Sequence, residues 1–277
     1  MFLWNASSRK EYIATNSLAV MHPTRAVLLH PLQPTLPPAT LTVLSYIMML
    51  TTIGVVVALG VVSTVTARTV LPLAKKAGTV AFFDPVAGGG SWLDNAGSGG
   101  GEPLNVVISG LSSPDVLTDD GIVNFARAIG FSTECFGIHL GDPQSANLGD
   151  GNGAVNQTIE LRQDFGSASV GTCLESLIGG NHFRVYRQNG PSANSGALFL
   201  AVSKEENVSQ HHTISADGYN VGRDALANSA IGIQSFGGVT YSTVADRLAN
   251  QMPSGVAGVN HGIAVDGTVV LLTVTIQ

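Results

Sequence analysis

The sequence predicts a single domain of the α+β or mixed α/β class, with a mixed sheet and a few helices, preceded by one hydrophobic helix. Short β-branched runs alternate with turns rich in Gly, Asn and Asp, and two stretches have a helical apolar period. Residues 39–67 hold no charged side chain. The chain has 277 residues, and the roughly 200 left without the apolar run and its flanks suffice for one core.

The first elements of the domain are a buried strand and an amphipathic helix. Residues 104–108 (LNVVI) form a short apolar run, which is typical of a buried strand. Thr118 or Asp119 can cap a helix that reaches Ile129, and Gly130 stops it. The apolar face of this helix comprises Ile122, Phe125, Ala126 and Ile129.

The later elements are mostly strands. A strand is expected over 131–140, a loop rich in Gly, Asp and Asn over 141–155, and a second helix over 221–233. Asp266-Gly267 suits a two-residue turn, so the last two strands are expected to form a hairpin. The remaining strands are expected at 157–161, 183–187, 197–202, 239–243, 261–265 and 268–276.

Residues 1–38 are polar and then rich in proline, which prevents regular helix, so this arm is expected to be disordered. Residues 39–67 (ATLTVLSYIMMLTTIGVVVALGVVSTVTA) are long enough to cross a bilayer as a helix. If retained, the run makes a single-pass membrane protein. If it is a signal peptide, cleavage would follow Val65-Thr66-Ala67. If translation began at Met48 or Met49, the apolar run would start at the N-terminus and would have a length closer to that of an ordinary signal peptide.

The topology signals conflict. Arg68, Lys75 and Lys76 follow the run, and the positive-inside rule would keep that side cytoplasmic. The glycosylation sequons at Asn156 and Asn207 favour a lumenal or extracellular domain instead. We predict that the protein enters the secretory pathway and is either secreted or held in the membrane through the uncleaved run.

The folded part is expected to follow a spacer. Residues 68–101 are interpreted as a basic flank and Gly-rich linker, and residues 102–277 as the globular domain. Trp92, Leu93 and Asp94 interrupt the Gly-rich stretch and are expected to pack onto that domain, because glycine allows close approach.

The charge balance and the cysteines indicate which kinds of partner and which compartment to expect. The net charge is −6, and acids outnumber bases beyond residue 77, which excludes a nucleic-acid partner. The two cysteines, Cys135 and Cys173, lack CxxC spacing. In an oxidising compartment they are expected to form a disulfide.

Polar residues with reactive potential gather between 181 and 224. His182 and Arg184 are two apart on a predicted strand, so they share a face. His211 and His212 are neighbours, so at most one of them joins that face. The leading hypothesis is a small anionic or surface ligand, oriented by His182 and His212 and bound by arginine. The candidate anion contacts are Arg184, Arg187 and Arg223.

Two other function classes stay open. A hydrolase or metal-dependent enzyme would pair a histidine with a carboxylate. The chain lacks HExxH and GxSxG motifs, so no metal and no cofactor is expected from spacing. A structural cell-surface protein would fit the Gly-rich stretch and the low charge. The enzyme candidates are His182, His211 and His212 with Asp164, Asp217 or Asp224, although Asp217 also suits a turn and Asp224 a helix start.

Seven blocks occur in a recognisable order: EPLNVVISG, FARAIGF, LRQD, NHFRVYR, GALFLAVS, HHTI and GRD. Together they cover residues 102–226 and resemble the LssY C-terminal domain family, most closely secreted or membrane-anchored fungal proteins of uncharacterised function. The family tends to have two adjacent histidines where this chain has Asn181-His182, which argues against a metal role there. The resemblance implies a shared domain and no known activity.

Overall fold

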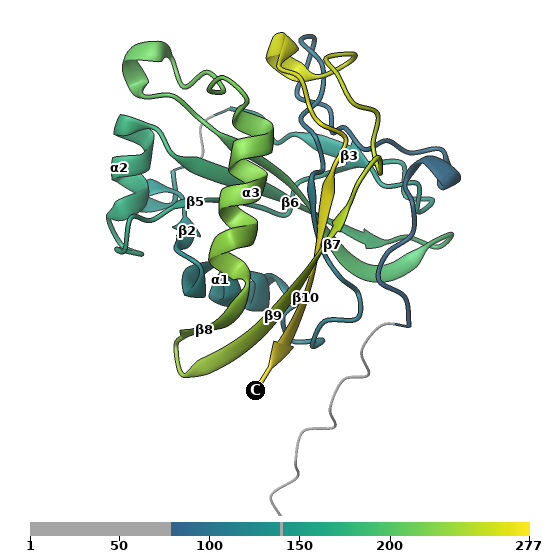
Figure 1. The fold of residues 1–277 in the computed structure, drawn as a ribbon, viewed down its shortest axis with the longest axis horizontal. Coiled ribbons are helices and arrows are strands. Elements are labelled where there is room, and N and C mark those ends of the chain that lie inside the picture. Colours follow the sequence, from purple (N-terminus) through teal and green to yellow (C-terminus); the bar gives the residue numbers. More distant parts are fainter. Residues whose placement is uncertain (1–78, 139–140) are drawn as a thin grey trace, which may run out of the picture. The chain divides into compact units, whose positions relative to one another are not determined.

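The computed structural model describes residues 79–138 and 141–277 (Figure 1). Within them the protein is a mixed α+β domain, in which a curled eight-stranded sheet is accompanied by three α-helices. The predicted mixed sheet with a few helices is therefore confirmed. The Pro-rich arm 1–38 and the apolar run 39–67 lie outside the described residues. Among those described, no helix is long and apolar enough to cross a bilayer.

The sheet has the strand order β2-β5-β6-β7-β1-β10-β9-β8. Neighbouring strands are antiparallel except β1 and β10, which run parallel with Val107 opposite Leu271. The strands of this sheet are β1 (Val106–Ile108), β2 (Phe131–Thr133), β5 (Ile159–Gln163), β6 (Asn181–Asn189), β7 (Asn194–Lys204), β8 (Gly232–Phe236), β9 (Val239–Leu248) and β10 (Val269–Ile276). A separate hairpin pairs β3 (Ser145–Asn147) with β4 (Ala154–Asn156). The helices are α1 (Asp119–Ala128), α2 (Gly171–Ile178) and α3 (Gly218–Ala230).

Both faces of the sheet are covered, which gives the domain two apolar cores. Successive side chains of a strand point to opposite faces, so Val106 and Ile108 of β1 enter one core while Val107 enters the other. Helices α1 and α3 cover the first face. The second face is covered by the Gly-rich residues and by the loop between β9 and β10, through side chains such as Trp92 and Met252.

The Gly-rich stretch is part of the domain, which corrects the linker interpretation for its described residues. Trp92 is 2% exposed and packs against Phe199 with tilted rings, whose centroids are 5.6 Å apart. Asp94 accepts a hydrogen bond from the backbone N–H of Glu102 at 2.7 Å. A Cβ atom at Gly90 would lie 2.3 Å from the carbonyl oxygen of Asn147, so this close approach requires glycine.

Helix α1 follows its sequence signals. The Thr118 hydroxyl accepts a hydrogen bond from the N–H of Gly121, and Asp119 and Asp120 lie in the first turn, where acidic groups stabilise a helix. Gly130 follows with a left-handed φ of 87°. The predicted helix to about residue 129 is therefore confirmed.

Three other expectations are wrong. Residues 261–265 form no hairpin with the last strand, because β10 pairs with β1 and β9 instead. β2 ends at Thr133, since Cys135–Gly137 forms a 3-10 turn. Helix α3 begins at Gly218, so Arg223 and Asp224 lie within it rather than at its start. The pattern also missed α2, β3, β4 and β8.

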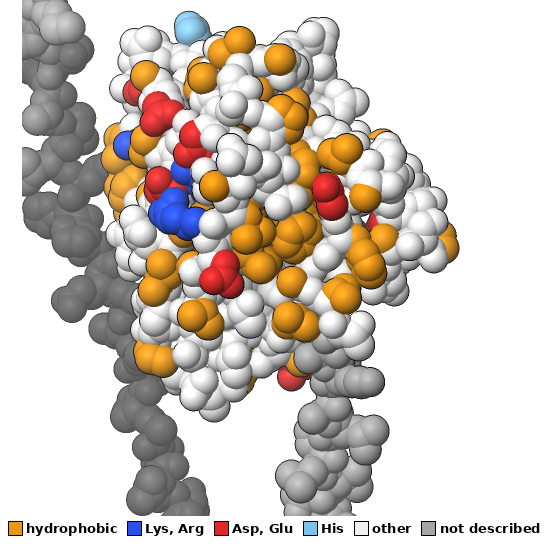
Figure 2. Space-filling view, turned by 45° about the vertical axis from the view of Figure 1, so that its right-hand side comes forward, with side chains coloured by type: hydrophobic (Ala, Val, Ile, Leu, Met, Phe, Trp, Pro, Cys, Tyr) orange, Lys and Arg blue, Asp and Glu red, His pale blue; other side chains and the backbone are white. Residues whose placement is uncertain are grey.

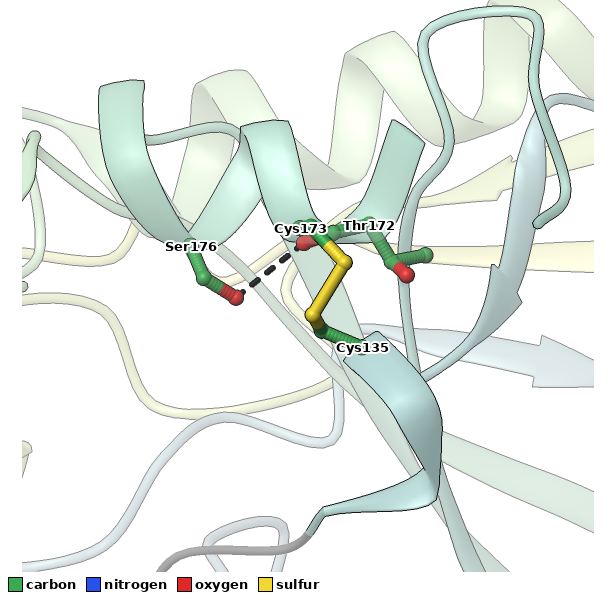
Figure 3. The surroundings of a disulfide bond; sticks show 4 residues. All are labelled: Cys135, Thr172, Cys173 and Ser176. Carbon is green, nitrogen blue, oxygen red and sulfur yellow. Dashed lines mark hydrogen bonds between the residues drawn. A yellow bond between two sulfur atoms is a disulfide. The ribbon is translucent and has the colours of Figure 1, made fainter. Parts of the chain in front are cut away.

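Cys135 and Cys173 form a disulfide, which joins the Cys135–Gly137 turn to α2 (Figure 3). Their Cα atoms are 4.7 Å apart. Of the two sequon asparagines, Asn156 is exposed on β4. Asn207 is half-buried and caps the turn Val208–Gln210 by accepting from the N–H of Ser209.

Candidate functional site

A cluster of charged side chains lies on the sheet face opposite α1 and α3. Strand pairing sets Arg162 of β5 opposite His182 of β6, and Glu160 of β5 opposite Arg184. Because residues two apart share a face, all four side chains point the same way. Phe183, between the two β6 members, points into the core beneath α1. We call this group and the carboxylates around it the charge cluster.

Arg162 is the centre of one half of the charge cluster. Its guanidinium lies 2.6 Å from Glu160, 3.1 Å from Glu175 and 3.2 Å from Glu205. Glu134 lies 3.7 Å away. These carboxylates come from β5, from α2, from the end of β7 and from the turn after β2, so Arg162 ties four separate segments together.

Arg184 is the centre of the other half. It contacts Glu102 at 2.8 Å and Glu160 at 3.2 Å. Asp94 joins this half by accepting a hydrogen bond from the Tyr186 hydroxyl at 2.8 Å. The Gly-rich stretch and the residue that follows it thus bring two carboxylates to the buried sheet face.

The charge cluster has an excess of negative charge. Six carboxylates, Asp94, Glu102, Glu134, Glu160, Glu175 and Glu205, surround two arginines. Burial outweighs the nearby guanidinium charges and raises the pKa of Glu102 and of Glu175 to about 7. Burial also raises the pKa of Asp94 and of Glu205. Such a site favours the binding of protons or of another cation.

His182 is fully buried within the charge cluster. Burial, together with Arg184 and Arg162, lowers its pKa well below the usual value, so the ring is neutral. Its Nε2 lies 3.2 Å from Arg184 Nη1 and 3.2 Å from Ser203 Oγ. A guanidinium only donates, so Nε2 accepts from Arg184 when the ring proton is on Nδ1. In the other tautomer, Nε2–H donates to Ser203 and the lone pair of Nδ1 faces Glu205.

Three buried ligand-type atoms converge near Glu205. His182 Nδ1 lies 3.6 Å from Glu205 Oε1, and His212 Nδ1 lies 3.5 Å from Glu205 Oε2. Ligand atoms of Glu175, His182 and Glu205 lie within 4.8 Å of one another. Among the described residues, Glu175 Oε1, His182 Nδ1 and His212 Nδ1 have no hydrogen-bond partner. Buried polar atoms are normally paired, so their convergence indicates room for an occupant.

A cavity of about 200 Å³ reaches this point from the surface. Its lining residues include Arg162, Glu205 and His212 of the charge cluster. They also include Glu134, Cys135, Ile138 and Ser176. Figure 3 shows Ser176 beside the disulfide, donating to the Thr172 carbonyl at 3.1 Å. The disulfide therefore holds together two elements of the cavity wall.

The structure brings two of the predicted histidines together and leaves the third apart. His182 and His212 both face Glu205. His211 is exposed. Both residues of the His211-His212 pair have left-handed φ angles, of 57° and 54°, so they are not on an extended strand. Only His212 of this pair lies near His182, as expected. The reason is the left-handed backbone of the pair and not the alternation of an extended strand.

The three predicted anion contacts do not share a site. Arg184 is engaged by carboxylates in the charge cluster. Arg187 points to the other sheet face, where it donates to the Leu117 carbonyl and to Asp119. Arg223 on α3 is held by Asp266 and Asp224. On the face shown in Figure 2, too, basic side chains lie beside acidic ones.

The predicted catalytic carboxylates also lie elsewhere. Asp164 accepts from the N–H of Gly166 at 2.8 Å and fixes a turn. Asp224 pairs with Arg223 and Arg247. Asp217 accepts from the Asn220 amide at the start of α3. The carboxylates beside the histidines are Glu175 and Glu205, which the sequence pattern did not single out. Glu160 and Arg162 are two positions apart on one strand, so strand alternation could have indicated that their side chains share a face.

Comparison of the chain with protein-family models, with curated proteins and with solved structures finds no match. The similarity to the LssY C-terminal domain family therefore stays a prediction.

Proposed function

We propose that this domain binds a divalent transition-metal ion through Glu175, His182 and Glu205, with His212 as a fourth ligand. The observation that carries the proposal is the set of three buried, unpartnered ligand atoms around Glu205. The excess of carboxylates over arginines supports a cationic ligand rather than the anionic one that the sequence favours. This replaces the sequence prediction of no metal, which rested on the absence of diagnostic spacing.

The donor set favours zinc-like chemistry. Two imidazole nitrogens with two carboxylate oxygens match the ligands that Zn²⁺ prefers, whereas Ca²⁺ and Mg²⁺ prefer oxygen alone. Four such ligands make a closed site, and three make a site with one position open to the cavity. The disulfide supports an oxidising compartment, so we propose that the domain works on the secretory route.

Metal binding would require one tautomer of His182. If Nδ1 binds the ion, the ring proton lies on Nε2 and donates to Ser203 Oγ, 3.2 Å away. Arg184 then has Glu102 and Glu160 as its remaining partners. Second-sphere partners of this kind typically change metal affinity by about 10–100-fold. Ser203→Ala is therefore expected to weaken binding without removing a ligand.

The test is calorimetric titration of the full chain with Zn²⁺ near pH 7. We expect one equivalent to bind, and we expect Glu175→Gln and His212→Asn each to weaken binding by at least about tenfold. Two substitutions are matched controls. His211→Asn makes the same change at the neighbouring position, and both positions have left-handed φ, which Asn tolerates. Glu206→Gln lies next to Glu205.

Two results would overturn the proposal. One is the absence of stoichiometric binding by the folded wild-type chain. The other is equal binding by His212→Asn, Glu175→Gln and their controls. Either result would identify the charge cluster as a buried ion-pair network that holds protons in place of a metal.

A further inference from the structure

An uncharged apolar surface surrounds the disulfide and is independent of the proposed metal site. We call it the α2 apolar surface. Phe136 is 79% exposed, Ile138 is 60% exposed and Leu177 is 57% exposed. Its members are Phe136, Ile138, Val170, Leu174, Leu177 and Ile178. A contiguous group of exposed large apolar side chains marks a site of contact with a protein or a membrane.

The fold holds these side chains in one place. Thr172 and Glu175 form the buried side of α2, which leaves Leu174, Leu177 and Ile178 on the outer side. The disulfide from Cys173 fixes the Cys135–Gly137 turn beside this helix, and the turn carries Phe136. Phe136 itself has a left-handed φ of 53°. The disulfide therefore keeps Phe136 close to the outer side of α2.

The chemistry of the surface favours lipid over protein. Residues 165–180 contain a single ionisable side chain, Glu175, and it is fully buried. Of the residue types that are enriched where proteins meet, namely Tyr, Trp, Phe, Met and Arg, this segment contains only Phe165. Leu, Ile, Val and Phe with small polar neighbours are typical of a face that enters the boundary between headgroups and acyl chains.

If the apolar run 39–67 lies in a bilayer, that bilayer is within reach of the domain. Eleven residues separate the apolar run 39–67 from residue 79, and eleven residues span at most about 36–40 Å. The backbone N–H of Phe83 bonds to Gln188, near the end of β6 that lies far from α2. The stretch of β6 from Asn181 to Gln188 is about 23 Å long. A bilayer that held the run could therefore meet the α2 apolar surface.

We propose that the α2 apolar surface docks onto the lipid surface of the membrane. Docking would also set the mouth of the cavity near the headgroups, because Ile138 belongs to both the surface and the cavity wall. The proposal does not depend on metal binding. A second copy of the chain is the main rival occupant.

The test uses the full chain in phosphatidylcholine vesicles, which carry no net charge. A single cysteine at Leu177 (Leu177→Cys) is labelled with an environment-sensitive dye, and lipid-borne nitroxides are used as quenchers. The control is Ser235→Cys on β8, an exposed residue at the other edge of the sheet. We expect quenching at residue 177 to exceed that at residue 235 by at least about twofold. Serine at Phe136, Leu174 and Ile178 is expected to abolish the difference.

Equal quenching at the two positions would overturn the proposal. So would a blue shift at residue 177 that depends on protein concentration but not on the quenching lipid, because that result would show a second copy on the surface. Circular dichroism and retention of the disulfide establish that the serine variant is folded. If it is not, Leu177→Ser alone, with the dye at Leu174→Cys, repeats the comparison.

Discussion

The buried carboxylates predict that the metal-free protein loses stability as the pH rises. Burial raises the pKa of Glu102 and Glu175 from 4.5 to about 7. The folded state therefore keeps protons that the unfolded chain has released. Stability from such a group is complete below the unfolded pKa and is lost as the pH passes the folded pKa. The window for both groups is thus pH 4.5 to 7.

The size of the effect follows from these values. Between pH 5 and pH 8 each of the two carboxyl groups costs about 2.5 kcal/mol, because one pKa unit corresponds to about 1.4 kcal/mol. His182 acts in the opposite direction, since burial lowers its pKa below the ordinary 6.5. The unfolded imidazole takes up a proton at low pH, so its release as the pH rises returns part of the lost stability. Burial raises the pKa of Asp94 and of Glu205 as well, and these two groups add to the loss, so we expect a net loss of stability from pH 5 to pH 8.

The assay is urea unfolding at pH 5, 6, 7 and 8 in the presence of a chelator. Glu102→Gln and Glu175→Gln should each remove about 2.5 kcal/mol of the pH dependence, whereas Glu206→Gln should leave the profile unchanged. Saturating Zn²⁺ should reverse the trend, because metal binding displaces the protons. The reasoning fails if the chelated protein gains stability from pH 5 to pH 8, or if the three variants share one profile.

Three further predictions concern stability. Asn105 makes three buried hydrogen bonds: its amide nitrogen donates to the carbonyls of Val202 and Tyr219, and its amide oxygen accepts from the N–H of Val202. Asn105→Ala should therefore lower the free energy of unfolding, measured in urea, by about 3 kcal/mol. The disulfide spans 38 residues, and replacing both cysteines by serine should cost about 4 kcal/mol; no change in the unfolding midpoint would contradict this. At Gly171 a Cβ atom would lie 1.4 Å from the Asp164 carbonyl oxygen, so Gly171→Ala should lower stability by about 1–3 kcal/mol, measured by thermal melting.

The sequence predicted those elements that are determined by residues close together in the chain. Helix α1 carries its cap at Thr118 and its stop at Gly130, so a short window of sequence contains its determinants. The shared face of His182 and Arg184 follows from strand alternation alone. These features needed no information about distant residues.

The missed features depend on long-range pairing. Glu175 and Glu205 lie 30 positions apart and meet through Arg162, which no spacing rule foretells. Helix α2 is eight residues long and is flanked by glycines, so its periodic signal is too short to separate from a loop. The Gly-rich stretch resembles a spacer by composition, and only its contacts with the second core distinguish it from one.

The central position of β10 has a consequence for how the protein acquires its structure. This strand lies between β1 and β9, so without it the sheet divides into a five-stranded part and a β9–β8 hairpin. The pairing of β1 with β10 joins Val106 to Val270, and such distant contacts slow folding. We expect the nascent chain to remain unfolded until residues 269–276 have been synthesised, a state that suits passage of an extended polypeptide through a translocation channel.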